Sequence, residues 1–460
     1  MAALAGFVAP LFWGVVVLSL LVFVHEAGHF LSARLCGMRV TEFYLGMPCR
    51  VRLSFRSRRY GTEVGVTPIL LGGYTRICGM EGEDDDLLAT CLASVQRQGR
   101  VAATDVAVEL GIDEERAYAL LATLCDWASI RPLYDPRRGE HPGQKTYPAR
   151  FETLARDADM LTEYDRGHDF ARAGSTTAGQ ARPVVGAPEE LLKMERSRTY
   201  RGKGFLARAF VLVAGPLVNI ALAFAIVVGS LCLAGISIAV NTNVIGHVEE
   251  GSCAAAAGLV DGDSITAVDD VATSDWNGLC DALGTALSAR RDFTVTYTHG
   301  GTSQTVTVDM PEGEQMTRFG IEAQRSVVRL NVIQASAYAL DYAGQVGTFA
   351  LRLIMPQHTV ETLQGTSSVV GVSAMAATAA SEGPRELLLF IAMVSMSLGF
   401  MNLLPIPPLD GGKVLIEIIQ LMVRRPIPTR VQNGISYLGL AFFLLVFCFA
   451  LKNDLSTLFF

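Results

Sequence analysis

The sequence predicts a polytopic α-helical membrane protein with four transmembrane helices, separated by three more polar blocks. Half of its 460 residues are hydrophobic and only 18% are charged, whereas a soluble globular chain carries about a quarter charged residues. The apolar residues gather in a few long uncharged runs, which is typical of helices that span a bilayer. The composition excludes a disordered chain and a small disulfide scaffold, and the net charge of −7 excludes a globally basic nucleic-acid binder.

Four uncharged runs are long enough to cross a bilayer, which takes about 20 apolar residues. The first occupies residues 1–24 and lacks the basic start and the cleavage site of a secretory signal, so we expect it to be a retained helix. The second has its apolar core at 210–238, the third lies between Glu386 and Asp410, and the fourth lies between Arg430 and Lys452. We therefore place the four helices within residues 1–36, 201–240, 386–412 and 413–460, the last range beginning with a cytoplasmic loop.

The charges beside these runs predict the orientation, because Lys and Arg favour the cytoplasmic side of short loops. Residues 34–76 hold eight Arg against two acidic residues, and six basic residues lie within 193–208, just before the second run. Four more lie between the third and fourth runs, whereas 241–384 is rich in Asp and Glu. We expect a multi-pass protein of the inner or plasma membrane, with both termini and 241–384 outside the cell.

Residues 37–80 predict a membrane-associated β region, in the form of a hairpin or reentrant sheet. Short runs of apolar and β-branched residues at 40–44, 51–55, 63–68 and 69–77 are separated by Gly and Pro, including the pair Gly72-Gly73. We expect this sheet at the cytoplasmic mouth of the membrane part.

Residues 81–200 predict a cytoplasmic insert, with an acidic linker at 81–86 and a flexible linker at 165–188. Residues 104–121 read as a helix, a turn at Gly111 and a second helix, which resembles the helix-turn-helix of a winged-helix domain with wing strands at 133–134 and 145–147. Such a domain binds DNA or contacts proteins. Because Asp113, Glu114 and Glu115 at the start of the second helix would repel phosphate, we do not expect a nucleic-acid partner.

Residues 241–325 predict a compact β-rich domain outside the cell, followed by an amphipathic linker over 326–385. The string from Gly251 to Asp269 resembles the signature of bacterial PDZ domains. These domains bind extended peptides by strand addition, so a peptide C-terminus is one candidate partner, and a packing or size-filtering role without a ligand is the alternative. Cys253 and Cys280 are the two cysteines of this block, and a disulfide between them is an open alternative.

The motif His25-Glu26-Ala27-Gly28-His29 ends the first uncharged run. On a helix, the two histidines stand one turn apart and can bind one zinc ion, with Glu26 placed to take a proton from a bound water. The alternative is a plain pair of interfacial histidines. Ionisable residues at the membrane edge are costly, so this position favours the functional interpretation.

A catalytic zinc site needs a third protein ligand and an open position for water. Asp410 is the candidate, because it ends the third uncharged run within the segment 402–412, which contains three prolines and two glycines. Irregular backbone at this depth is tolerated only inside protein or beside a water-filled cavity. A cap on the next helix is the alternative role for Asp410.

Three motifs in this order, HEAGH, GPLVN at 215–219 and NLLPIPPLDGG at 402–412, resemble the site-2 protease family. These are intramembrane zinc metalloproteases, and the bacterial branch with a PDZ domain includes the regulator of sigma E protease. The resemblance implies Zn²⁺ held by His25, His29 and Asp410, with Glu26 as the general base. It also implies contacts with the substrate for Asn402, Pro405, Asn219, Gly72 and Gly73.

The expected activity is cleavage of single-span membrane proteins, such as anti-sigma factors, within or near the lipid bilayer. The alternative is a non-catalytic membrane scaffold or receptor that uses the PDZ and winged-helix-like modules. Metal content separates the two, because only the enzyme requires stoichiometric zinc.

Overall fold

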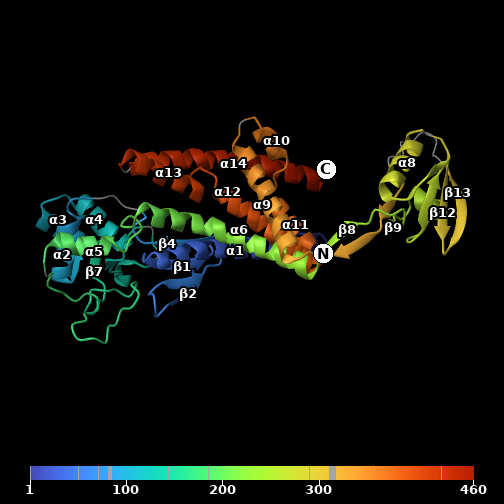
Figure 1. Cartoon of the computed structure of the whole chain (residues 1–460). Helices are drawn as coiled ribbons and strands as arrows, with labels where there is room; N and C mark the ends of the chain where they lie inside the picture. The colour runs from blue at the N-terminus through green and yellow to red at the C-terminus, as the bar shows by residue number, and fades with distance from the viewer. Residues whose placement is uncertain are drawn as a thin grey trace. The chain divides into compact units, whose positions relative to one another are not determined.

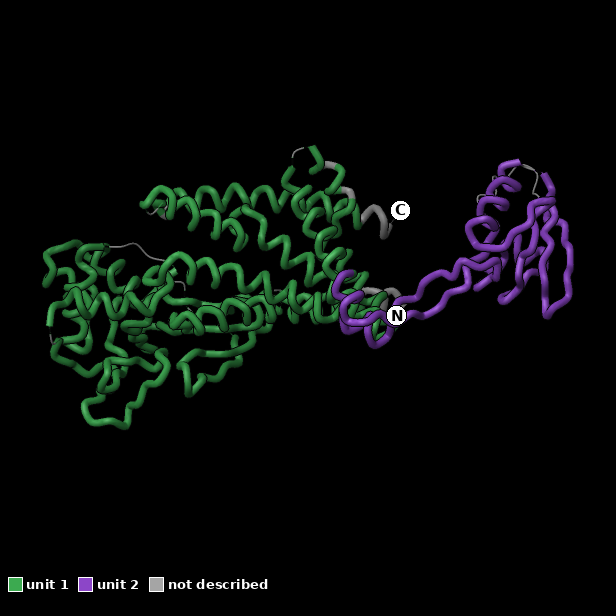
Figure 2. Tube along the Cα trace, viewed as in Figure 1, with its two compact units in different colours: residues 1–227, 338–460 green, residues 228–337 purple. Residues whose placement is uncertain are grey.

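The structure is a computed structural model of the whole chain. It describes every residue except 1, 50, 71, 81–84, 143, 145, 185, 290, 310–317, 356, 426 and 460, so most of the expected acidic linker lies outside the described residues. The chain divides into two compact units, residues 1–227 with 338–460 and residues 228–337 (Figure 2).

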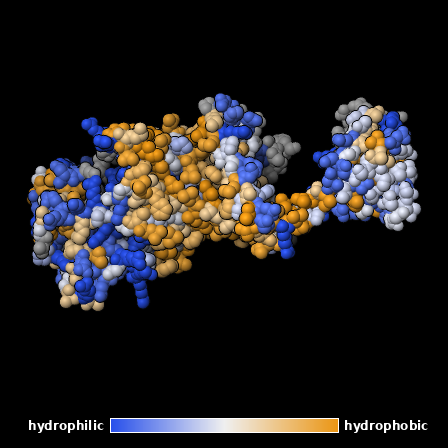
Figure 3. Space-filling view, in the orientation of Figure 1, coloured by the Kyte–Doolittle hydropathy of each residue, from blue (hydrophilic) through white to orange (hydrophobic). Residues whose placement is uncertain are grey.

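Among the described residues, four helices are long and apolar enough to cross a membrane (Figure 1), namely α1 (Ala2–Leu35), α6 (Phe205–Leu233), α12 (Pro384–Asn402) and α14 (Thr429–Phe459). Each falls on one of the four uncharged runs, and Figure 3 shows a broad apolar surface over the helices of the first unit. The second run was expected to stay helical to Ile238. Instead α6 ends at Leu233, because Gly235 takes φ +78° and the next residues form a strand.

Further helices among the described residues are α9 (Val332–Ile354), α10 (Thr359–Gln364), α11 (Val369–Glu382) and α13 (Asp410–Val423). Helix α11 packs along α1 and α12, and the three share one apolar cluster that includes Leu21, Ala376 and Ile391. Segment 326–385, expected as an amphipathic linker, therefore contains three helices.

A four-stranded sheet follows α1, formed by β1 (Val40–Leu45), β2 (Leu53–Arg56), β3 (Glu63–Val66) and β4 (Gly73–Ile77) in the order β2-β3-β1-β4. Strands β1 and β3 are parallel, and the other pairs are antiparallel. Strand β4 is an edge of the sheet and lies against α1, where the Thr75 hydroxyl donates to the backbone carbonyl of Glu26 at 3.1 Å. The edge of the sheet is thereby fixed beside the HExxH turn.

The insert begins with α2 (Leu88–Gln98), β5 (Arg100–Ala102), α3 (Ala103–Leu110) and α4 (Glu114–Asp126), and it ends with β6 (Ile130–Pro132), β7 (Arg150–Thr153) and α5 (Pro188–Arg196). Its three strands pair in the order β5-β7-β6, and Leu92, Leu121 and Phe151 lie in its core.

The expected wing strands at 133–134 and 145–147 were wrong. The paired strands are β6 and β7, and described residues from 133 to 149 form their connection, with Lys145 outside the described residues.

A buried ion network holds the insert against the end of α1. Arg39 forms a bidentate pair with Asp165 (Nε–Oδ1 2.8 Å, Nη2–Oδ2 2.6 Å) and donates to Glu195 Oε2 at 2.6 Å. Arg156 donates to the other oxygen of Glu195 at 2.8 Å, and Arg198 lies 3.1 Å from Asp165. Since Asp165 is buried in this network, the expectation of a flexible linker beginning at 165 was wrong.

The second unit contains two strand pairs, β8 (Ile236–Ala239) with β15 (Arg325–Val328) and β9 (Ile245–Val248) with β14 (Ile321–Ala323). A sheet in the order β11-β10-β12-β13 is built from β10 (Ser264–Val268), β11 (Val271–Ala272), β12 (Phe293–His299) and β13 (Thr302–Val308). Helices α7 (Cys253–Ala256) and α8 (Trp276–Ser288) pack on this core. Cys253 and Cys280 are free thiols, so no disulfide joins them.

Candidate active site

Helix α1 places both histidines of the HExxH motif on one face, because residues four apart lie one above the other. This face packs against α6 at very short range. A side-chain carbon on Gly28 would lie 2.7 Å from the Ala214 carbonyl oxygen, and one on Gly215 would lie 2.4 Å from His29 Nε2. The two glycines therefore allow the close helix crossing that presses the His29 ring against α6.

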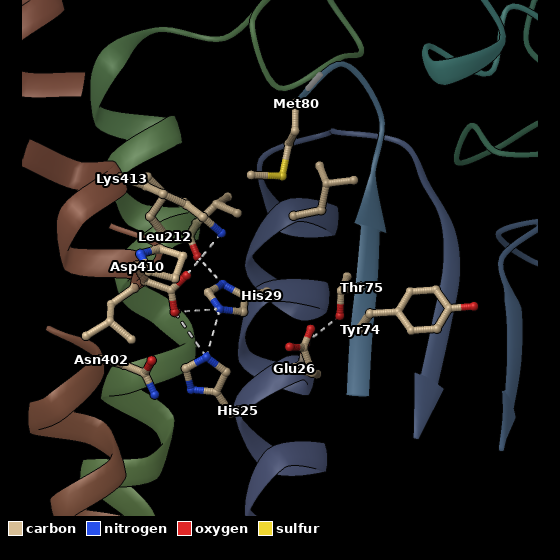
Figure 4. Close-up of a pocket in the computed structure, with 14 residues that line it drawn as sticks. His25, Glu26, His29, Tyr74, Thr75, Met80, Leu212, Asn402, Asp410 and Lys413 are labelled. Carbon is tan, nitrogen blue, oxygen red and sulfur yellow. Dashed lines mark hydrogen bonds and ion pairs between the residues drawn. The ribbon is translucent and has the colours of Figure 1, made fainter. Parts of the chain in front are cut away.

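The Asp410 carboxylate meets the two histidines across the bundle (Figure 4). Its Oδ2 lies 3.0 Å from His25 Nε2 and 3.2 Å from His29 Nε2, and the two Nε2 atoms are 3.2 Å apart. All three residues are buried, with 8%, 8% and 7% of their surface exposed. Three ligand atoms from α1 and α13 thus converge on one point.

The start of α13 fixes the place of Asp410. The chain between α12 and α13 folds back so tightly that a side-chain carbon on Gly411 would lie 2.1 Å from the Leu403 carbonyl oxygen. One on Gly412 would lie 2.2 Å from the Pro407 nitrogen. The two glycines after Asp410 therefore let the Pro-rich loop pack beneath the helix, which brings the carboxylate to the histidines.

The chemistry of these donors fits a zinc ion. His29 Nδ1 lies 2.8 Å from the Val211 carbonyl oxygen, which can only accept, so Nδ1 carries the proton and the Nε2 lone pair faces His25 and Asp410. Two imidazole nitrogens and one carboxylate oxygen lie within 4.8 Å of one another, and this is the three-ligand set of many catalytic zinc sites. The Val211 contact is the kind of outer partner that orients a metal-binding histidine.

A cavity of about 290 Å³ opens beside the cluster (Figure 4). Its walls come from α1, β4, α6 and the segment around the start of α13. The lining residues are His25, Glu26, His29, Tyr74, Thr75, Ile77, Met80, Val211, Leu212, Asn402, Pro408, Leu409, Asp410 and Lys413.

The structure brings together five of the residues predicted from the sequence, namely His25, Glu26, His29, Asn402 and Asp410. Gly73 lies next to them, since a side-chain carbon there would be 3.3 Å from Glu26 Cγ.

The other three predicted residues, Gly72, Pro405 and Asn219, do not line the cavity. Asn219 is fully buried, and its side-chain amide has no hydrogen-bond partner among the described residues, while its backbone carbonyl accepts from Ser395 of α12 at 2.8 Å. Its place is in the packing of α6 against α12.

Sequence reasoning missed Tyr74, Thr75 and Lys413. Lys413 Nζ lies 3.6 Å from Asp410 Oδ1, three residues along the same helix, and helical periodicity beyond Asp410 is the signal that would have found it.

Tyr74 donates to Glu42 Oε2 at 2.8 Å. Burial and the nearby Glu42 carboxylate raise the pKa of Tyr74, so this phenol stays protonated at neutral pH.

Known proteins resemble this chain along most of its length. Residues 13–446 match peptidase family M50. The chain is similar to the regulator of sigma-W protease RasP of Bacillus subtilis (strain 168), at 24% identity over 450 residues that cover 97% of this chain and 98% of the relative. It is equally similar, at 24% identity, to zinc metalloproteases named RasP from Shouchella clausii (97% and 98% covered) and Geobacillus kaustophilus (97% of each chain covered). The chain therefore belongs to peptidase family M50, the site-2 proteases, and is a membrane-integral zinc metalloprotease.

Proposed function

We propose that the protein is an endopeptidase that cleaves single-span membrane proteins within or near the bilayer. The observation that carries the proposal is the convergence of His25, His29 and Asp410, with Glu26 in the same cavity. The two histidines and Glu26 lie on α1, a helix long and apolar enough to span a membrane. A zinc site in a soluble domain does not require an apolar helix of this length, whereas a site that acts on membrane proteins does.

We assign the zinc to His25, His29 and Asp410. When bound, zinc lowers the pKa of a coordinated water to about 7 and polarises a peptide carbonyl. Glu26 follows His25 on the helix and lines the cavity, on the side of the histidines that faces β4 (Figure 4). It accepts the proton of the attacking water and returns it to the leaving amine, as a general base and then a general acid.

The substrate enters as an extended chain, because a peptide bond in a helix is shielded by its own hydrogen bonds. Strand β4 is a sheet edge, and its residues Tyr74, Thr75 and Ile77 line the cavity. We assign β4 as the edge that pairs with the substrate backbone and holds the scissile bond beside Glu26. Asn402 lies on the opposite wall, and we assign it a contact with the substrate backbone.

We assign the site to the cytoplasmic face, with the β-rich second unit outside the cell as a PDZ domain. The Arg-rich stretch after α1 and the acid-rich stretch 241–384 support this orientation. The PDZ domain selects substrates by binding a peptide C-terminus or by filtering the size of their outer part. One relative is named regulator of sigma-W protease, and we carry over from it an anti-sigma factor as the substrate class.

We assign the insert a winged-helix-like fold, with α3 and α4 as the helix-turn-helix, and its sheet order β5-β7-β6 supports this assignment. The first turn of α4 holds exposed Glu114 and Glu115, and Arg116 is paired with Asp85 and Asp86. These charges oppose a phosphate backbone, so we assign the insert to protein contacts.

The test compares cells that express the wild type with cells that express Glu26→Gln, and catalogues membrane-protein fragments. We expect at least one single-span protein whose fragment appears only with the wild type. Glu115→Gln, a change at an exposed glutamate of α4, is the matched control and should behave as the wild type.

If no fragment depends on Glu26, the proposed proteolysis of membrane proteins is wrong. The scaffold alternative predicts that cells with the wild type and cells with Glu26→Gln contain the same fragments.

A further inference from the structure

We propose that a second pocket, formed by Arg58, Arg59, Arg166, Gly167 and His168, binds a phosphate group, in the first place that of an anionic phospholipid headgroup. The pocket has a volume of about 250 Å³, and these five residues line it. It shares no residue with the cavity of the zinc ligands. The proposal concerns a ligand that the proteolytic reaction does not use.

The pocket has a strongly positive lining. Three of its five residues are arginines, which stay charged at any physiological pH, and no carboxylate lines it. His168 Nδ1 lies 2.8 Å from the Asp165 carbonyl oxygen, so Nδ1 is the donor and the ring is held in place. Guanidinium groups match the oxygens of a phosphate with paired N–H donors, which makes arginine the usual residue for phosphate recognition.

The acidic residues nearby are already engaged elsewhere. Glu163 accepts from Arg56 with both oxygens, each at 3.0 Å, and Asp165 is paired with Arg39 and Arg198.

Arg58, Arg59 and Arg166, by contrast, form no ion pair with any of the described residues, and all three are exposed. Three neighbouring arginines without a carboxylate repel one another, and an anion offsets that repulsion.

The pocket joins two segments that are far apart in the chain but fixed to the same helix end. Arg34, in the last turn of α1, lies over the Tyr60 ring at 4.4 Å and donates to the Tyr164 carbonyl oxygen at 2.8 Å. Arg59 lies over the same ring at 5.3 Å. The loop after β2 and the loop of the insert that begins at Tyr164 are thus anchored where the candidate membrane span Val8–Leu35 ends.

The neighbouring strand favours a lipid over a soluble anion. In β2, Leu53 and Phe55 point to the same side of the sheet and are 76% and 66% exposed. Large apolar side chains followed within a few residues by arginines are typical of a segment at the boundary of headgroups and acyl chains. Figure 3 shows the apolar surface over the helices giving way to a hydrophilic surface over the insert. A phosphate at this depth belongs to a headgroup.

The test measures binding of a fluorescent phosphatidylglycerol to the full chain in neutral detergent micelles, with phosphatidylcholine as the zwitterionic comparison. The triple variant Arg58→Gln/Arg59→Gln/Arg166→Gln removes the charge of the pocket. The matched control removes three exposed arginines of the insert elsewhere, Arg97→Gln/Arg137→Gln/Arg138→Gln. The single variant Arg166→Gln tests whether Arg166 of the insert contributes to the same site as Arg58 and Arg59 of the loop after β2.

We expect the wild type and the control to bind phosphatidylglycerol alike, and the triple variant to bind it at least about tenfold more weakly, since each basic residue near a membrane surface contributes about fivefold. Arg166→Gln alone should lose about threefold to fivefold. Phosphatidylcholine should bind all four proteins equally. Unchanged melting temperatures of the variants exclude a loss through misfolding.

A titration with inorganic phosphate separates the two sources of the ligand. One outcome is that inorganic phosphate binds the wild type but not the triple variant, while both bind the lipid equally. The pocket is then a phosphate site whose ligand is soluble phosphate and not a lipid headgroup. If the triple variant binds both probes as the control does, there is no phosphate site and the proposal is overturned.

Discussion

Two buried clusters of ionisable side chains lie on either side of the end of α1, and they differ in how their charges are matched. Beyond the helix, Arg39 and Arg156 donate to Asp165 and Glu195, so each donor faces an acceptor of opposite charge. Around the zinc site, the groups that meet are the Nε2 atoms of His25 and His29 on α1 and a carboxylate oxygen of Asp410 on α13, each of which can supply a lone pair to a metal ion. A cluster that is matched internally holds the fold together, and a cluster of converging acceptors is suited to bind a cation.

The comparison also separates stability from function. Burying charges is costly, and the cost is recovered in the insert by close pairing within the chain. In the zinc site the chain places three potential metal ligands together, with the partly exposed Lys413 beside one of them, and such incomplete matching within the chain is typical of a functional site. Changes in the first cluster should therefore reduce stability, and changes in the second should reduce activity.

Asp410→Asn should have the largest effect. The neutral amide is a poor metal ligand, so zinc content should fall from one per chain to near zero, and activity should fall by at least about a thousandfold, beyond the roughly 10- to 100-fold cost of changing an outer-shell partner. Metal analysis and cleavage of a single-span reporter measure the two effects.

The control for this change is Asp261→Asn, at an exposed aspartate that also lies beside a histidine, with 3.2 Å between Oδ2 and His247 Nδ1. It should keep both zinc and activity. An Asp410→Asn protein that retains stoichiometric zinc would remove Asp410 from the ligand set.

Arg39→Met should lower the stability of the insert by about 3–5 kcal/mol, because it leaves Asp165 and Glu195 buried without their main partner. Hydrogen exchange and limited proteolysis of the insert should both accelerate, while the folded fraction keeps its zinc. Arg116→Met, at an exposed arginine paired with Asp85, is the control and should change little. Loss of zinc together with the loss of protection would show that the two clusters are not separate.

Acid should loosen the insert only below about pH 4, where carboxylates of the unfolded chain begin to take up protons. Burial alone would raise the pKa of Asp165 and of Glu195, but the arginines that bind them lower both below their usual values. A carboxyl group with a lowered pKa stabilises the fold above its unfolded pKa and loses that contribution as pH falls towards its folded pKa. Hydrogen exchange of the insert should be equal at pH 7 and pH 5 after correction for the intrinsic rate, and faster at pH 3. Loosening between pH 7 and pH 5 would contradict this origin.

The sequence predicted the parts of the molecule that have a local signature. The four long helices follow from uncharged runs, and the His25–His29 pair follows from the four-residue spacing on a helix. The strands of the insert were harder to place, because residues 133–134 and 145–147 suggested strands, whereas the paired strands β6 and β7 lie just outside these positions.

The long-range pairs had no such signature. Arg39 was counted only as a positive charge beside a membrane helix, but it pairs with Asp165, which lies 126 residues later. Asn219 belongs to a motif and was therefore assigned to the substrate, while the structure buries it between α6 and α12. Both outcomes depend on tertiary packing, which a pattern of neighbours along the chain does not contain.

The smallest effect should come from Lys413, a cation that lines the cavity beside the zinc ligands. Asp410 turns Oδ2 towards the histidines, and its other oxygen, Oδ1, lies 3.6 Å from Lys413 Nζ. Lys413→Met removes the cation that holds this orientation. Because the lysine is half-exposed and screened by solvent, zinc affinity should fall by only about threefold to tenfold, at the low end for an outer-shell partner.

Competition with a chelator measures this affinity, and Lys413→Arg, which retains the charge, should restore most of it. Lys193→Met, at an exposed lysine of α5, is the control. Hydrogen exchange of the insert should be unchanged in all three variants, because the ion network around Arg39 contains neither lysine. If Lys413→Met binds zinc as tightly as the control, the ion pair with Asp410 is a surface contact without influence on the metal site, and the orientation of Asp410 then depends on the backbone of the Pro-rich loop alone.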